Sequence, residues 1–455
     1  MAHTIDHSSV PDRISVDVSW RAYILDWLQA SSRAKAALVG CVILMTISPA
    51  SLSAMMPFIT ASFSAQTARP MPEAILLFVA MPLLISPIFL PIAGAWVDRW
   101  GARKVAIPAS ILYATVTALV PLCSQLPWFL GVVIVLAAIF GFMGSFAVVF
   151  KVITGWFPRH RGMGFALIGA VSSLAGAFLS PVFLWIIGSP HATTGSGLGW
   201  DGTYYVVAAC IAVLGIPSAL FLISEPDYAK TVPTLPKPPT KAELKEIPGF
   251  TLRNALRNRT WIFIVFSLSL AAAGPMAIRQ NAVGFFGERG FDPSTVALSQ
   301  SVLFIASIVG LFCGGMILDR ARRPWVVFPI LAAVPVGLLL SYINHGNVAL
   351  LFVANAFLGF AMGSESSLGP FLIARYFGLK CFAQLQGLTM AISTLFLGLS
   401  PFVVSAMQAA SGSYAIPFIV LIALAGLAAL LALFLPDYPA EWAQPSSRTD
   451  QAVRL

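Results

Sequence analysis

Charge is the scarcest property of this sequence. Only 10% of its 455 residues are Asp, Glu, Lys or Arg, whereas 58% are hydrophobic. A soluble globular protein carries about 25% charged residues, and so few charges cannot cover the surface of a water-soluble fold of this size. The composition therefore argues against a soluble enzyme and indicates a chain that is surrounded largely by lipid.

Other absences narrow the class further. The five cysteines are widely spaced and odd in number, so they indicate neither a disulfide framework nor a metal site. No phosphate-binding Gly-x-x-x-x-Gly-Lys-Ser/Thr segment is present, and we expect no cofactor and no direct use of ATP. The net charge of +9 comes from basic residues spread singly between apolar runs, so nucleic acid is not expected as a partner.

Long apolar runs dominate what is present. Twelve of them reach the roughly 20 residues that a helix needs to cross a bilayer. They cover residues 36–60, 74–97, 105–125, 127–152, 163–187, 203–224, 261–286, 296–318, 325–344, 348–374, 381–408 and 414–435. The polar, proline-rich stretch between the sixth and seventh runs predicts a linker between two six-helix halves.

An internal repeat supports this division. The segment Gly94-Ala-Trp-Val-Asp98-Arg99 after the second run recurs 221 residues later as Gly315-Met-Ile-Leu-Asp319-Arg320 after the eighth. Six helices return the chain to the same side of the membrane, so the two repeats are parallel. The predicted fold is an all-α integral membrane protein with twelve transmembrane helices in two parallel six-helix repeats. Its predicted parts are an N-tail (1–33), an N-terminal half (34–224), a linker (225–260), a C-terminal half (261–435) and a C-tail (436–455).

The distribution of Lys and Arg predicts the orientation. If the N-terminus is cytoplasmic, 23 of the 27 basic residues fall in the tails, the linker and the inner loops, and only Arg69 and Arg289 fall in outer loops. Cytoplasmic loops are enriched in Lys and Arg. We therefore expect a multi-pass protein of the plasma (inner) membrane with both termini cytoplasmic.

The repeated segment carries a family resemblance. Extended through Gly101 to Arg103 and Lys104, its first copy resembles the signature loop between helices two and three of the major facilitator superfamily, and its second copy resembles the degenerate repeat of that loop. The resemblance spans residues 34–436 and implies that the loop controls the conformational equilibrium of a transporter. The residues it implicates are Asp98, Arg99, Arg103, Asp319 and Arg320.

A second resemblance narrows the family. The segments Thr154-Gly-Trp156-Phe157-Pro-Arg159-His-Arg161-Gly162 and Gly363-Ser-Glu365 are similar to the bacterial monocarboxylate-porter and oxalate/formate-antiporter relatives. That family moves small organic anions, often with a proton. Many members carry a substrate-binding Arg in helix eight, but the run 296–318 has no charge, so a carboxylate would be recognised by another residue.

Three charges lie within the predicted spans, namely Lys151, Arg279 and Glu365. A charge that faces lipid costs about 2.5 to 3.5 kcal/mol even on the mildest scale, so each should face water or a partner. The resemblance places their helices, the fourth, seventh and tenth, around a central cavity. Burial near the midplane favours the neutral form of Glu365, which makes it a candidate proton carrier.

The predicted substrate-binding residues are Arg279, Lys151, Gln280, Asn281, Ser48, Ser51 and Asn355. Each has a simpler alternative role. Lys151 is close enough to the interface to extend into it, small polar residues also serve helix packing, and Arg279 and Glu365 also suit a permanent structural pair.

The sequence predicts a secondary active transporter, expected to be a monomer, that takes up a small organic anion together with a proton. A drug/proton antiporter is the alternative within transport, although the excess of positive charge in the cavity disfavours it. A non-transporting membrane sensor on the same scaffold is the alternative outside transport. A long regulatory extension would favour the sensor, and the tails are short.

Overall fold

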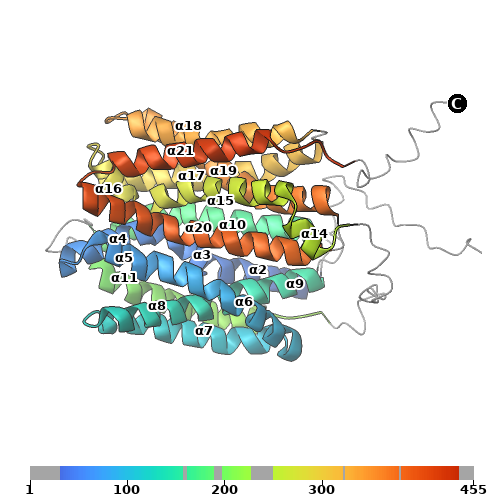
Figure 1. Cartoon of the computed structure of the whole chain (residues 1–455). Coiled ribbons are helices and arrows are strands. Elements are labelled where there is room, and N and C mark those ends of the chain that lie inside the picture. The colour runs from blue at the N-terminus through green and yellow to red at the C-terminus, as the bar shows by residue number, and fades with distance from the viewer. Residues whose placement is uncertain are drawn as a thin grey trace, which may run out of the picture.

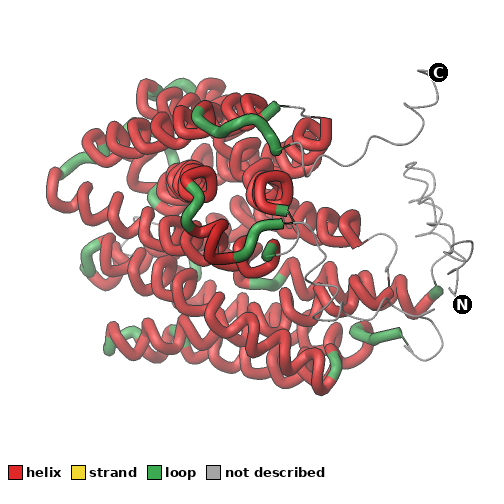
Figure 2. Tube along the Cα trace, turned by 45° about the vertical axis from the view of Figure 1, so that its right-hand side comes forward, coloured by secondary structure: helices red, strands yellow, loops and turns green. Residues whose placement is uncertain are grey.

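The computed structural model describes residues 31–156, 161–188, 197–226, 249–320, 323–378 and 381–439. Its ordered elements are helices, which lie side by side along one common direction (Figure 1). The remaining described residues form the connecting loops (Figure 2), with one isolated bridge between Gly249 and Gly378. The predicted all-helical architecture is confirmed.

The first six membrane-length segments, here called the N-half, include several interrupted helices, although α7 (Ala102–Leu119) and α10 (Arg161–Ile187) are continuous. Their elements are α2 (Ser32–Thr46), α3 (Pro49–Leu52), η2 (Ser53–Met55), α4 (Met56–Thr67), α5 (Met71–Ile75), η3 (Leu76–Ala80), α6 (Met81–Trp100), α7 (Ala102–Leu119), η4 (Pro121–Cys123), α8 (Pro127–Phe142), η5 (Met143–Ala147), α9 (Val148–Trp156), α10 (Arg161–Ile187), α11 (Gly199–Cys210), η6 (Ile211–Gly215) and η7 (Ser218–Leu222).

The helices after the linker, here called the C-half, are longer and less interrupted. Their elements are α14 (Leu252–Leu256), α15 (Arg259–Gln280), α16 (Ala282–Gly287), α17 (Pro293–Arg320), η8 (Pro324–Val326), α18 (Val327–Ile343), α19 (Val348–Phe377), α20 (Phe382–Ser411) and α21 (Ala415–Leu433).

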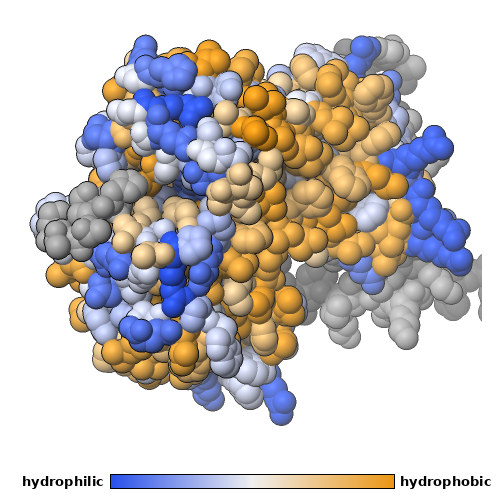
Figure 3. Space-filling view, turned by 60° about the vertical axis from the view of Figure 1, so that its left-hand side comes forward, coloured by the Kyte–Doolittle hydropathy of each residue, from blue (hydrophilic) through white to orange (hydrophobic). Residues whose placement is uncertain are grey.

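Eleven helical segments of the described chain are long and apolar enough to cross a membrane. The one predicted span without a counterpart among these segments is the third, residues 105–125, which corresponds to α7, a helix of 18 residues with Arg103 and Lys104 in its first turn. A wide hydrophobic surface lies between polar ends (Figure 3). Large apolar side chains such as Trp185, Phe221 and Phe178 are mostly exposed. This pattern fits a bundle whose solvent is hydrocarbon.

The buried side chains form two main clusters. One is built almost entirely from the N-half and the other from the C-half. Each half therefore has its own core, and the surface between them is an interface and not a shared core.

The bundle has two distinct ends. We call the end where α6 reaches Trp100, α14 lies and α19 reaches Phe377 the linker end, and the opposite end, which carries α16 and the connection between α18 and α19, the loop end (Figure 1). The Lys and Arg distribution predicts that the linker end is cytoplasmic.

The two halves meet closely toward the loop end. Along α10 and α17, Ser180 Oγ donates to the Ala297 carbonyl (3.3 Å), and Ser301 Oγ donates to the Ala177 carbonyl (2.6 Å). Nearer the middle, Ser307 Oγ and Ser173 Oγ are 3.0 Å apart. The helix α20 packs against α5 and η3 in the same region. These contacts close the interface between the halves at the loop end.

Glycine sets the spacing of two helices within the C-half. A methyl group added at Gly359 or Gly363 of α19 would lie 2.1 Å from the Leu303 carbonyl oxygen or 1.9 Å from that of Ser307, both on α17. The absent side chains allow the two backbones to touch, as small residues commonly do in membrane helices. This contact fixes the position of α19 two residues before Glu365.

Candidate functional site

A cavity of about 330 Å³ lies between the two halves. Its walls come from the N-half elements α3, η2, α6 and α8, and from α15, α18, α19 and α20 of the C-half. The lining residues are Pro49, Ala50, Ser53, Leu83, Phe142, Ala271, Ala272, Pro275, Met276, Arg279, Leu331, Val334, Ala361, Met362, Glu365, Ser366 and Leu397. Two of the three charges singled out from the sequence, Arg279 and Glu365, therefore face one central cavity.

Arg279 is held by weak partners. Its side chain is 8% exposed, Nη1 donates to Ser53 Oγ (3.2 Å), and Nη2 donates to the sulfur of Met276 (3.2 Å). The guanidinium carbon lies 5.5 Å from the ring centroid of Phe304. Nε is buried and has no hydrogen-bond partner among the described residues. The guanidinium thus keeps unused donors in a cavity that is largely apolar.

Glu365 lies on α19 in the wall of the same cavity. Within the described segments no hydrogen bond or ion pair reaches its carboxyl group, and the two ion pairs there join Arg69 to Glu73 and Lys151 to Asp98. Arg279 and Glu365 therefore do not neutralise each other directly in this structure.

The first membrane segment breaks between α2 and α3, and two predicted binding residues hold that break. Ser48 Oγ and Ser51 Oγ both donate to the Met45 carbonyl (2.7 Å each), and Ser51 Oγ lies 3.1 Å from Ser172 Oγ. The break follows from Pro49, which occupies the first position of α3. Ser48 and Ser51 do not line the central cavity or the second cavity described below. Ser53, two residues after Ser51, lines both.

The remaining predicted polar residues are placed differently from one another. Gln280 lines a second cavity, and its Oε1 atom is buried without a partner in the described chain. Asn281 Nδ2 donates to the Ala277 and Pro401 carbonyls (2.9 and 3.1 Å). Asn355 Nδ2 donates to Leu351 (3.0 Å) within α19. Asn281 and Asn355 thus join backbone groups of the helices, and neither lines a cavity described here.

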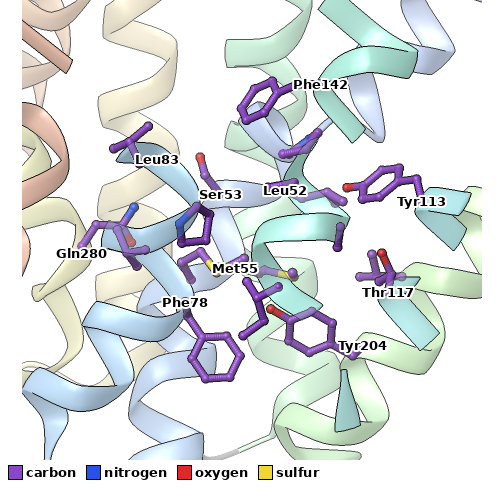
Figure 4. A pocket seen from close by; sticks show the side chains of 18 of the residues that line it. Leu52, Ser53, Met55, Phe78, Leu83, Tyr113, Thr117, Phe142, Tyr204 and Gln280 are labelled. Carbon is purple, nitrogen blue, oxygen red and sulfur yellow. The ribbon is translucent and has the colours of Figure 1, made fainter. Parts of the chain in front are cut away.

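The second cavity, of about 100 Å³, lies next to the central cavity, mostly among N-half helices, with Met276 and Gln280 of α15 on one side (Figure 4). Pro49, Ser53, Leu83, Phe142 and Met276 line both spaces. The other residues around it are Leu52, Met55, Met56, Phe78, Val79, Pro82, Tyr113, Thr117, Ile134, Ala137, Ala138, Tyr204, Val207 and Gln280. Sequence reasoning missed this cavity.

A local change of helix type shapes one wall of the second cavity. The π-helical segment η3 carries Phe78 and Val79 and ends two residues before Pro82. Proline has no N–H group for the carbonyl four residues earlier, which is the kind of defect that disturbs a regular helix. Pro82 was therefore the sequence signal for an irregular wall at this place.

The signature loop pairs with a residue that was predicted to bind substrate. Lys151 Nζ lies 2.5 Å from Asp98 Oδ1 at the linker end, where the Asp98 side chain is 69% exposed. Lys151 lines neither cavity, so its geometry does not support the predicted contact with substrate. Arg99 and Arg103 are exposed. The side chains of Asp319 and Arg320, in the second copy, lie outside the described residues.

The loop is also tied to the end of the N-half. The carboxylate of Glu225 accepts a hydrogen bond from the N–H of Ala102, at the start of α7. Trp156 Nε1 donates to the carbonyl of Ser224, the residue before Glu225 (2.8 Å). An acidic group at a helix N-terminus is favourable. The chain entering the linker is thus fastened to the signature loop.

Comparison with known proteins supports the family suggested by the signature loop. The Major Facilitator Superfamily model matches residues 38–283 and 276–454. The probable sulfoacetate transporter SauU of Cupriavidus necator is 25% identical over 378 residues, which cover 76% of this chain and 81% of that protein. The anhydromuropeptide permease of Escherichia coli is 26% identical over 209 residues, 44% of this chain and 40% of that protein.

Solved structures show the same fold. A mutant of the nucleoside transporter NupG superposes with a TM-score of 0.69 at 15% identity, covering 88% of this chain and 99% of that one. A bacterial homologue of the lysosomal transporter Spinster, in an inward-facing and unoccupied conformation, gives 0.66 at 17% identity, covering 92% and 100%. With the family model matched over most of its length, this chain belongs to the Major Facilitator Superfamily of membrane transporters.

Proposed function

We propose that this transporter takes up a small organic anion of the monocarboxylate type together with a proton, by alternating access. One observation carries the proposal: the Arg279 guanidinium faces the central cavity with no carboxylate bonded to it in the described chain. The planar guanidinium group matches the geometry of a carboxylate and can bind it through two hydrogen bonds.

Glu365 supplies the coupling in this proposal. An anion bound at Arg279 leaves a cavity whose remaining charge depends on whether Glu365 is protonated. With the proton bound, the loaded site carries no net charge, and the halves can reorient without exposing an uncompensated charge to hydrocarbon. The substrate gradient and the proton gradient are linked because the loaded neutral form is the one that reorients.

The proposal draws further support from one relative and from the closed end. The Cupriavidus necator relative is a probable transporter of sulfoacetate, a small organic anion that carries a sulfonate as well as a carboxylate. Contacts between α10 and α17 close the interface at the loop end, so we propose that the central cavity is reached from the linker end in this state. The Lys and Arg residues at that end support a cytoplasmic orientation for it.

Binding and transport test the proposal together. Purified protein should be stabilised against heating by short carboxylates, because a ligand that binds the folded state raises the midpoint. Proteoliposomes should then accumulate the stabilising anion when the pH is lower on the side from which the anion enters. Stabilisation by cationic drugs instead would favour the drug/proton antiporter. Binding of an anion without any transport would favour a sensor.

A further inference from the structure

We infer that the second cavity is the subsite for the body of the transported anion, so that the substrate is an organic acid with a short apolar segment and an uncharged polar end. The inference rests on the proposed function, since it takes Arg279 as the site of the acid group. It adds what lies beyond that group and how long the molecule is.

The two cavities meet at Ser53 and Met276. Both residues line both spaces, and both contact the guanidinium, through Ser53 Oγ at 3.2 Å from Nη1 and through the Met276 sulfur at 3.2 Å from Nη2. An acid group that displaces these weak partners sits at the junction. Its carbon chain then has a direct way into the second cavity.

The walls of the second cavity suit an uncharged segment. Most are aliphatic, methionine or aromatic side chains, among them Leu52, Met55, Phe78 and Val207, and no Asp, Glu, Lys or Arg of the described chain lines the space. Ligand pockets commonly combine such walls with a few polar groups that fix orientation. A second charged group on the substrate would lack a partner there and would be costly to bury.

Two polar side chains, Gln280 and Thr117, line the cavity on opposite sides. Gln280 Oε1 and Thr117 Oγ1 are each buried and lack a hydrogen-bond partner in the described chain, and their residues are 1% and 2% exposed. Figure 4 shows Gln280 on one side of the space and Thr117 on the other, with Tyr204 below it. Buried polar groups normally find partners. A polar end on the ligand would supply one to Thr117.

The volume limits the length of the segment. The cavity measures about 100 Å³, and a dry protein cavity of about 150 Å³ binds a benzene molecule. The space therefore holds roughly four carbon atoms in addition to the acid group. Acids that are too short leave it unfilled, and longer ones must extend back into the central cavity.

A chain-length series tests the inference on the full protein. The dependence of thermal stabilisation on ligand concentration gives an affinity for each straight-chain acid from acetate to octanoate. We expect affinity to rise about fourfold for each added methylene, as burial of a methylene group predicts, and to level off near pentanoate or hexanoate. Adipate, which carries a second carboxylate, should bind at least tenfold more weakly than hexanoate.

Two variants with matched controls locate the segment. Ala138→Leu fills the cavity, so the rise in affinity from acetate to pentanoate should disappear while acetate still binds. Ala423→Leu, at an exposed site on α21, should leave the affinities of all the acids unchanged. Thr117→Val should remove any preference for 6-hydroxyhexanoate over hexanoate. Thr115→Val, two residues away and exposed, should keep that preference.

The outcomes separate the inference from the proposed function. If no carboxylate stabilises the protein, or if hexanol does so as well as hexanoate, the proposed function fails and the inference fails with it. If acids bind but affinity is independent of chain length, or if Ala138→Leu leaves the length dependence intact, the proposed function stands and the second cavity is not the subsite.

Discussion

Arg279 and Glu365 line the same central cavity and do not form an ion pair. The guanidinium instead contacts Ser53 Oγ and the Met276 sulfur, and no described group bonds to the carboxyl of Glu365. A permanent structural pair would have used each residue to neutralise the other. Their separation leaves one group available for an anion and the other for a proton, which leads to different predictions for each.

Removing the guanidinium should remove anion binding. Arg279→Ala is expected to weaken the affinity for carboxylates at least about thirtyfold, since truncating one partner of a buried charged pair costs about 2 kcal/mol or more. Arg279→Lys keeps the charge but loses the paired hydrogen bonds, and it should fall in between. Ligand-dependent thermal stabilisation measures both, with the exposed Arg253→Ala as control. Unchanged affinity in Arg279→Ala would place the anion elsewhere.

Glu365→Gln should separate exchange from accumulation. Glutamine resembles the protonated carboxyl and cannot release a proton, so the loaded variant should still reorient and exchange labelled substrate across the membrane. It should fail to concentrate substrate when a pH difference is imposed on proteoliposomes. A variant that still accumulates substrate under those conditions would make Glu365 structural and move the coupling site to another residue.

The sequence predicted the residues whose burial is costly and missed what helix packing creates. Arg279 and Glu365 were found because a charge inside a span needs a partner or water. For the break between α2 and α3, the sequence signal is Pro49 next to Ser48. The second cavity joins side chains from several separate helices and one π-helical wall, so no local pattern encodes it.

The pairing of Lys151 was missed for a similar reason. The sequence indicated how deep Lys151 lies along its span. It did not indicate the partner, because Asp98 lies 53 residues away on another helix. Only the packing of α9 against α6 brings the two together. The resemblance implicated Asp98 together with Arg99 and Arg103, both of which are exposed, and it did not point to Lys151.

The Asp98–Lys151 pair should act on the conformational equilibrium and not on substrate affinity. Because Asp98 is 69% exposed, the pair is worth about 0 to 1 kcal/mol, a change of up to roughly fivefold in the ratio of two states. Asp98→Asn and Lys151→Gln should each change turnover within that range, and the double variant should match either single one. Exchange rates in proteoliposomes measure turnover. Independent, multiplying effects would show that the pair is not the acting unit.

Accessibility of introduced cysteines tests the orientation. In a cysteine-free background, Asn254→Cys on α14 at the linker end should react with a membrane-impermeant thiol reagent only after the cytoplasmic side is opened. Gly346→Cys, between α18 and α19 at the loop end, should react in intact cells. Both sites are exposed, so a difference in labelling reports sidedness and not burial. The reverse pattern would invert the orientation and place the linker end, from which we propose that the central cavity is reached, on the outer side of the membrane.

Gly363 gives the most direct test of how the site is positioned. A methyl group at this position would lie 1.9 Å from the Ser307 carbonyl oxygen, so Gly363→Ala must push α19 away from α17. Forced overpacking of this kind costs about 1 to 3 kcal/mol, and Glu365, two residues on, would shift with the helix. We expect a lower unfolding midpoint together with impaired proton-driven accumulation. Gly387→Ala is the matched control, because nothing lies within 4 Å of its added methyl group. If Gly363→Ala is as stable as Gly387→Ala and couples normally, α19 is not held by this contact, and the position of Glu365 must be set by the other helices that pack against α19, above all α18.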